Sequence, residues 1–140
     1  MQYSRISLKE AAKFHGHLGP YLVLGLKAGE LALKKLRCKK YFGLEVKVWG
    51  ATHKPKSCLI DGLQLSTGAT YGKGNIEKLN GHMVKIEFFN KPDRRRIALR
   101  FKKGLINILE KTKSHKACDL FAEKLYKTDC LSLFELITHN

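Results

Sequence analysis

The sequence predicts an α+β fold, a mixed or antiparallel sheet packed with helices, in a single domain that spans residues 1–140. Two alternating apolar segments, 82–89 and 95–101, flank a short Asn-Lys-Pro-Asp turn, a pattern typical of an antiparallel hairpin. Helical patterns lie on both sides of this hairpin along the chain. A chain of 140 residues is the usual size for one hydrophobic core, so we expect no second domain.

The N-terminal part is predicted to form two helices with a break between them. Ser7 and Glu10 make a capping-box pattern that opens a short helix through residue 14. Glycines at 16 and 19 interrupt this helix, and Pro20 begins a second one that runs to about residue 38. On the second helix Gly25 and Gly29 share a face with little side-chain bulk, which favours a packing notch for another element.

The remaining elements follow from alternation, capping and glycine content. Alternate apolar residues predict a strand over 44–51. Ser57 is expected to cap a helix that runs from Cys58 to about Ser66, and a glycine-rich stretch over 67–75 follows it. After the hairpin, two or three more helices are predicted, over about 102–112, 115–126 and 131–137.

The chain is strongly basic, with 27 Lys and Arg against 12 Asp and Glu and a formal net charge of +15. The excess is densest over residues 91–116, which include Arg94, Arg95 and Arg96. Such a surface attracts polyanions, and nucleic acid is one possible partner. No aromatic-rich strand signature accompanies the basic run, so a simple role in solubility is favoured over nucleic-acid binding.

The cysteines and the apolar segments indicate the compartment. Four cysteines, at 38, 58, 118 and 130, include no Cys-x-x-Cys pair, so we expect free thiols in a reducing cytoplasm. No targeting segment is visible at the N-terminus. The most apolar stretch, 20–36, contains lysines and a glutamate, and we therefore expect no membrane span.

His15 and His17 are the first residues that could carry chemistry. Two residues apart, they cannot share one face of a continuous helix, and they converge only if the helix ends near Gly16. Two imidazoles at such a reversal could hold a divalent metal. The alternative is a histidine that satisfies a loop carbonyl, and spacing alone favours neither interpretation.

Cys58 and Asp61 form the second candidate group. They lie three residues apart on the predicted helix, and Gln64 lies beside Asp61. A cysteine in the first helical turn, with Lys54 and Lys56 nearby, is expected to favour its thiolate. The alternative is a buried structural cysteine. Asp61 stands in an otherwise apolar helix and needs a partner, such as a metal, a lysine or backbone donors.

The glycine-rich stretch 67–75 is the third candidate. Its glycines allow close approach of the backbone to an anion, although the spacing does not match a Walker A loop. Lys73, between two glycines, is placed to meet an anion or a carboxylate. The alternative is a tight turn in which Thr67 or Thr70 makes the hydrogen bonds.

Together these segments resemble a known family, the core domain of FmdE, a component of formylmethanofuran dehydrogenase. Two motifs in order, about forty residues apart, carry the resemblance, which covers roughly residues 8–105. The motifs are Phe14-His15-Gly16-His17-Leu18-Gly19-Pro20 and Cys58-x-x-Asp61-Gly62-x-Gln64-x-x-Thr67-Gly68-x-Thr70-x-Gly72-Lys73-Gly74-Asn75.

The resemblance implies an α+β core that assembles as an intertwined homodimer, with a cleft that takes a divalent transition metal, zinc. It implies metal ligands at His15, His17 and Cys58. It also implies candidate catalytic residues at Cys58, Asp61 and Lys73. The residues expected around a cofactor are Gln64, Thr67, Gly68 and Gly72.

Two departures from the family narrow what the resemblance implies. Many relatives have cysteine where this chain has Gly19, so one sulfur ligand is missing. Many also carry a C-terminal four-cysteine zinc module, which we do not expect here. The chain would then be an accessory component of a larger redox complex, or a small enzyme. A basic module for nucleic acid or protein, without catalytic activity, is the alternative.

Overall fold

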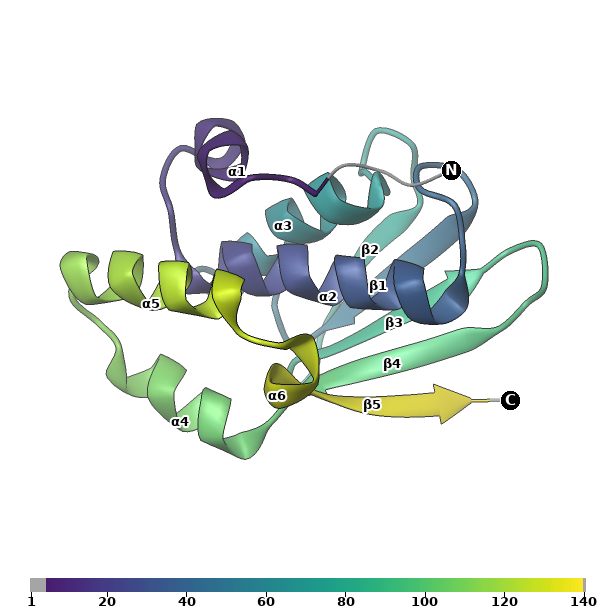
Figure 1. Ribbon diagram of the computed structural model, residues 1–140. Helices are drawn as coiled ribbons and strands as arrows, with labels where there is room; N and C mark the ends of the chain where they lie inside the picture. The colour runs from purple at the N-terminus through teal and green to yellow at the C-terminus, as the bar shows by residue number, and fades with distance from the viewer. Residues whose placement is uncertain (1–4, 140) are drawn as a thin grey trace.

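The computed structural model describes residues 5–139, and it describes side chains as far as residue 137. Helices cover one face of a five-stranded sheet (Figure 1). None of the helices in the described part is both long and apolar enough to cross a membrane. The elements are α1 (Leu8–His15), α2 (Pro20–Leu36), β1 (Leu44–Trp49), α3 (Cys58–Thr67), β2 (Ile76–Leu79), β3 (Lys85–Asn90), β4 (Arg96–Phe101), α4 (Lys103–Lys111), α5 (His115–Lys127), α6 (Cys130–Leu133) and β5 (Phe134–His139).

The sheet is mixed, which confirms the predicted α+β class. Its strand order is β2-β1-β3-β4-β5, with β1 and β2 parallel and the other neighbours antiparallel. The parallel pair requires a crossover connection, and α3 lies in the connection between β1 and β2. Alternation in β1 buries Leu44, Val46 and Val48. The opposite face of that strand is exposed at Glu45 and Lys47.

The helix starts and ends follow the local signals at the N-terminal part of the chain. The capping box is present, because the Ser7 hydroxyl accepts from the Glu10 amide at 3.1 Å and the Glu10 carboxylate accepts from the Ser7 amide at 3.2 Å. The bond from the Ser7 amide to the carboxylate is the main cause that lowers the pKa of Glu10. Helix α1 ends at His15, and the residue that caps it, Gly16, has a φ of 107° in the left-handed region. Pro20 then begins α2, as predicted.

The predicted notch on α2 is confirmed, and α3 fills it. A Cβ built on Gly25 would lie 2.8 Å from the Cα of Gly62, and the reverse substitution would be equally close. One turn further along, Gly29 faces the Ser66 side chain, whose hydroxyl donates to the Gly25 carbonyl at 3.1 Å. The two helix backbones are therefore in direct contact, which side chains at these positions would prevent.

Two strands differ from the sequence predictions. The segment 131–137 is predicted to be a helix, but only α6 is helical, and β5 then pairs with β4 at the edge of the sheet. Phe134 lies opposite Phe101 in this pairing, so tertiary contacts decide the conformation of a short apolar segment. Strand β2 is absent from the sequence predictions, because only four residues after the glycine-rich stretch form it.

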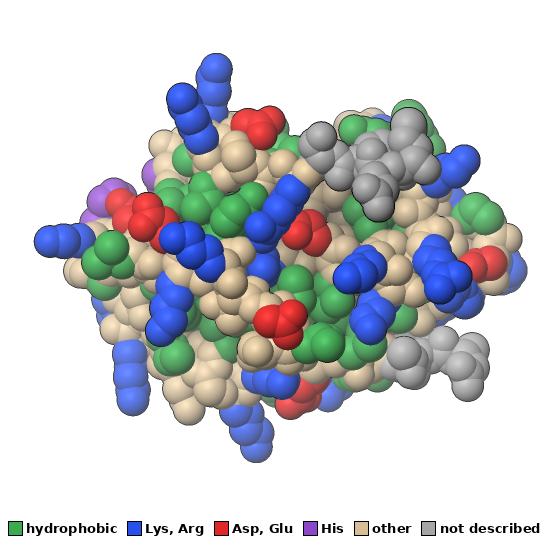
Figure 2. Space-filling model, in the orientation of Figure 1, with side chains coloured by type: hydrophobic (Ala, Val, Ile, Leu, Met, Phe, Trp, Pro, Cys, Tyr) green, Lys and Arg blue, Asp and Glu red, His purple; other side chains and the backbone are tan. Residues whose placement is uncertain are grey.

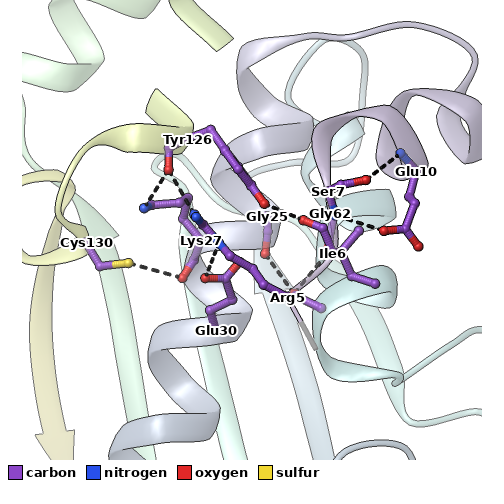
Figure 3. Close-up of polar contacts among 11 residues, drawn as sticks. Arg5, Ile6, Ser7, Glu10, Gly25, Lys27, Glu30, Gly62, Tyr126 and Cys130 are labelled. Atoms are coloured by element: carbon purple, nitrogen blue, oxygen red, sulfur yellow. Dashed lines mark hydrogen bonds and ion pairs between the residues drawn. The ribbon is translucent and has the colours of Figure 1, made fainter. Parts of the chain in front are cut away.

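An N-terminal clasp, made by Arg5, Ile6, Lys27, Glu30 and Tyr126, ties the end of α5 to α2 (Figure 3). Arg5 Nη2 and Lys27 Nζ both donate to the Tyr126 carbonyl, at 2.8 and 3.1 Å. Arg5 also pairs with Glu30 at 3.1 Å. The Tyr126 hydroxyl donates to the Ile6 carbonyl at 2.7 Å. The clasp therefore fixes the C-terminal end of α5 against the body of the protein.

Candidate functional site

His15 and Asp61 form the central pair of the site. His15 is the last residue of α1, and Asp61 lies on α3. The two side chains meet with 2.6 Å between Nδ1 and Oδ2. Asp61 thus finds its partner in a histidine, which was not among the expected partners. An ionised carboxylate only accepts hydrogen bonds, so His15 Nδ1 is the donor in this contact. In the neutral form of the ring, Nε2 then carries the lone pair.

His17 lies next to His15, as the break at Gly16 allows. Their ring centroids are 4.9 Å apart, with an angle of 64° between the planes. His17 Nδ1 lies 3.2 Å from the Leu18 carbonyl oxygen, which can only accept. Both histidines therefore use Nδ1 as a donor, and in the neutral form of each ring Nε2 is the acceptor. This is the protonation state in which imidazole binds a metal.

Gln64 connects this pair to the glycine-rich stretch. Its side-chain nitrogen donates to Asp61 Oδ1 at 3.4 Å, and its side-chain oxygen accepts from the Tyr71 amide at 3.1 Å. Asp61 is thereby held on both carboxylate oxygens, by His15 and by Gln64. The contact gives Gln64 a positioning role in this network.

Cys58 lines a pocket with His17, but its expected thiolate is not supported. Burial raises the pKa of the Cys58 thiol, the Asp61 carboxylate raises it further, and Lys54 only partly offsets this. Ser57 has helical backbone angles and makes no capping hydrogen bond with its side chain. Helix α3 begins at Cys58 with Ser57 at the cap position, as predicted, but the expected capping bond from the Ser57 side chain is absent.

The glycine-rich stretch is largely fastened to the protein itself. Thr67 is fully buried, and its hydroxyl donates to the Leu63 carbonyl at 2.6 Å. Gly68 ends α3 with a φ of 78°, as the tight-turn alternative requires. Asn75 is buried, accepts from the Thr70 amide at 2.9 Å and donates to the Tyr41 carbonyl at 2.5 Å. These contacts give the stretch a structural role.

Lys73 has its own set of contacts, which does not include His15 or Asp61. Its Nζ donates to the Thr70 hydroxyl at 3.1 Å and lies 5.6 Å from the centre of the Phe42 ring. No ion pair joins Lys73 to a carboxylate within residues 5–137. Gly72 beside it is open, because a Cβ there would approach only the Thr70 hydroxyl, at 3.8 Å.

Comparison with known families shows to which family the chain belongs. A family model described as "FmdE, Molybdenum formylmethanofuran dehydrogenase operon" matches residues 14–130. The chain belongs to the FmdE family. The match includes His15, His17, Cys58 and Asp61, so the paired motifs of the sequence lie inside the family region.

A solved structure has the same fold as this FmdE-family chain. It is a tungsten formylmethanofuran dehydrogenase FmdE-like protein from Syntrophus aciditrophicus, with a TM-score of 0.66 and 19% sequence identity. The match covers 94% of this chain and 69% of that one. At this identity the likeness establishes the fold alone.

A curated relative shares only part of the chain. A probable S-adenosyl-L-methionine-binding protein from Archaeoglobus fulgidus is 30% identical over 76 residues. The match covers 49% of the FmdE-family chain and 19% of the relative, so it spans about a fifth of that protein.

The single chain offers only part of a metal-ligand set at this site. His15 and His17 offer two imidazole Nε2 atoms, which suits a transition metal. Across the described side chains, however, no group of three or more His, Cys, Asp or Glu could hold a metal ion. Cys58 therefore does not complete a ligand set with the two histidines in this conformation.

His115 and Cys118 are site residues that the sequence did not reveal. The His115 ring centroid lies 6.3 Å from that of His17, and both residues line the pocket that contains Cys58. No spacing pattern could have found them, because α5 reaches the histidines only through the tertiary fold. The pocket thus brings together residues from α2, α3 and α5.

Proposed function

We propose that this FmdE-family chain is a metal-binding core protein that holds a divalent transition metal, zinc, at His15 and His17. The hydrogen bonding of the two rings carries the proposal. Each Nδ1 faces an oxygen acceptor, so in the neutral form of each ring Nε2 is the nitrogen that offers its lone pair to a metal. Carboxylates and carbonyls commonly fix metal-binding histidines in this way.

In this proposal Asp61 is a positioning residue, because its contact to His15 Nδ1 orients the ring. Gln64 holds the second oxygen of the carboxylate. Cys58 is the proposed third ligand, reached by a change of its side-chain rotamer. Its thiol would lose a proton on binding, since metals take cysteine as thiolate. A bound metal would supply Lewis-acid activation of a water or a carbonyl oxygen.

The assembly and the setting are also proposed from the family. We propose a homodimer in the cytoplasm, as an accessory component of a larger redox complex or as a small enzyme. Light scattering of the purified chain would give the mass directly. A monomer at all concentrations would contradict the homodimer.

Cobalt(II) titration of metal-free, untagged protein tests the metal site. We expect one ion per chain, lost in His15→Ala and in His17→Ala. The control His82→Ala removes an exposed histidine and should bind normally. Wild-type protein that takes up no ion, or site variants that bind as the control does, would contradict the proposal.

Two further variants separate the roles of the neighbours. A thiolate-to-cobalt charge-transfer band that disappears in Cys58→Ser would assign Cys58 as a ligand. Asp61→Asn should weaken binding by about 10–100-fold without changing the ligand spectrum, as expected of a positioning residue. A ligand spectrum altered by Asp61→Asn would instead place Asp61 on the metal.

Nucleic-acid binding through Arg94, Arg95 and Arg96 is less well supported. Arg95 pairs with Asp93 at 2.6 Å, and its hydrogen bonds lower the pKa of Asp93. Arg96 pairs with Glu87 at 3.3 Å. Lys and Arg side chains are scattered over the face in Figure 2 and do not form a single patch. Salt-independent binding of RNA or DNA, or none, would remove this alternative.

A further inference from the structure

A groove lies beside His17. We call it the α4–α5 groove, because the connection between these helices forms one wall and the start of α2 and the loop before α3 form the other. Two adjoining cavities of about 250 and 790 Å³ make it up. Residues that line both cavities are Pro20, Tyr21, Pro55, Lys113 and Cys118.

The two ends of the groove differ in chemistry. The smaller cavity contains His17, Cys58 and His115. The larger cavity is bounded by Leu109, whose side chain belongs to the hydrophobic core, and by Glu110. In the orientation of Figure 2, histidine side chains lie at the left edge of the molecule, near the start of α5, with acidic and basic side chains beside them. The groove is therefore apolar along its floor and polar toward the histidines.

The charge of the lining is positive. Lysines at 56, 111 and 113 line the larger cavity, against one carboxylate, Glu110. Among the described residues, no hydrogen bond or ion pair engages the Lys111 or Lys113 ammonium groups or the Tyr21 hydroxyl. Burial, with a smaller contribution from Glu110, raises the pKa of Tyr21, so its hydroxyl remains a hydrogen-bond donor.

We propose that the α4–α5 groove binds a small organic anion, with the anionic group at Lys113 and Tyr21 and the apolar body against Pro20 and Leu109. The combined cavities have the size of a small-molecule site. The excess of lysine over carboxylate selects a carboxylate, sulfonate or phosphate. The site goes beyond the proposed metal centre, with which it shares only His17 and Cys58.

A pair of fluorescent probes tests the proposal on the full chain. The anionic probe is 8-anilinonaphthalene-1-sulfonate, and N-phenyl-1-naphthylamine is the matching neutral probe without the sulfonate. EDTA is present, so that the result does not depend on the metal site. We expect the anionic probe to saturate at one per chain and to bind at least several-fold more tightly than the neutral probe.

Three variants locate the bound probe. Lys113→Gln and Tyr21→Phe should each raise the Kd of the anionic probe several-fold and leave the neutral probe unchanged. The control Lys124→Gln removes the same charge from an exposed position on α5 outside the groove and should have no effect. The dissociation constants come from fluorescence titration, and circular dichroism shows that each variant is folded.

Three results would overturn the proposal. Equal binding of the two probes would mean that the anionic group is not recognised. Equal effects of Lys113→Gln and Lys124→Gln would mean that only net charge matters. Loss of probe binding as the protein dimerises with rising concentration would mean that a second copy of the chain occupies the groove. Because these assays contain EDTA, a failed metal titration leaves their outcome unaffected.

Discussion

The α2–α3 contact and the α4–α5 groove lie at opposite extremes of packing in one small protein. At the first, Gly25 and Gly62 bring two helix backbones together so closely that neither position has room for a methyl group. At the second, the connection from Leu109 to Cys118 leaves cavities of about 250 and 790 Å³ against the start of α2. The α2–α3 contact fixes the residues of the candidate site in place, and the α4–α5 groove leaves that site open to a ligand.

The closely packed α2–α3 contact, which we call the closed region, determines where the polar groups of the site lie. Asp61 precedes Gly62 on α3, so the depth at which α3 packs on α2 sets the position of the carboxylate that meets His15. The α4–α5 groove, the open region, makes no such demand. Among the described residues, no hydrogen bond or ion pair engages the ammonium groups of its lysines. Substitutions should therefore disturb stability in the first region and ligand binding in the second.

The largest effect should come from Gly62→Ala. Its Cβ would lie 2.8 Å from the Cα of Gly25, so the helices must separate, and we expect a loss of about 3 kcal/mol in the free energy of unfolding. Gly104→Ala is the matched control on α4, where a Cβ meets nothing within 4 Å. It should stabilise the protein by about 0.5 kcal/mol. Urea unfolding of both variants measures the difference, and equal effects would refute the contrast.

Asn75→Ala should have the next largest effect on stability. The side chain is buried and satisfies the Thr70 amide and the Tyr41 carbonyl, which would both lose this partner. We expect a loss of about 2 kcal/mol. Asn80→Ala, in the exposed turn after β2, is the control and should change stability far less. A loss no greater than that of the control would show that the glycine-rich stretch does not depend on this anchor.

Local signals in the sequence were sufficient for much of the closed region. The capping box at Ser7, the restart at Pro20 and the notch at Gly25 each depend on residues close together in the chain. Strand β5 could not be predicted in this way, because its pairing with β4 is a long-range contact. The four residues of β2 likewise gain their register only from β1.

In the candidate site, too, the features that depend on local sequence were predictable and those that depend on long-range packing were not. The convergence of His15 and His17 follows from the break at Gly16, which the sequence displays. The Asp61 partner and the approach of His115 depend on packing between helices that are far apart in sequence. The Cys58 thiolate was expected from its position in the first helical turn and from the nearby Lys54 and Lys56, and burial reverses the sign of the shift in pKa.

Arg5→Ala tests whether the clasp belongs to the closed region. The substitution removes the ion pair with Glu30, the bond to the Tyr126 carbonyl and a guanidinium stacked 3.7 Å from the Tyr126 ring centre. Because Arg5 is partly exposed, we expect a loss of only about 1 kcal/mol in urea unfolding. Lys9→Ala, on the exposed face of α1, is the control. Binding of the anionic probe should stay unchanged. Weaker binding of this probe would mean that the two ends of α5 are coupled.

The smallest effect should appear at Cys58, where the two regions meet. Asp61 raises the pKa of this thiol, so Asp61→Asn should lower the pKa and increase the thiolate fraction at pH 8. Burial, the larger cause, remains, and the alkylation rate with iodoacetamide should therefore rise only a few-fold. Mass spectrometry follows each cysteine separately, and Cys38 in the same sample is the control. An unchanged alkylation rate at Cys58 would mean that burial alone sets the reactivity of this thiol. The Asp61 carboxylate would then have no influence on the thiol.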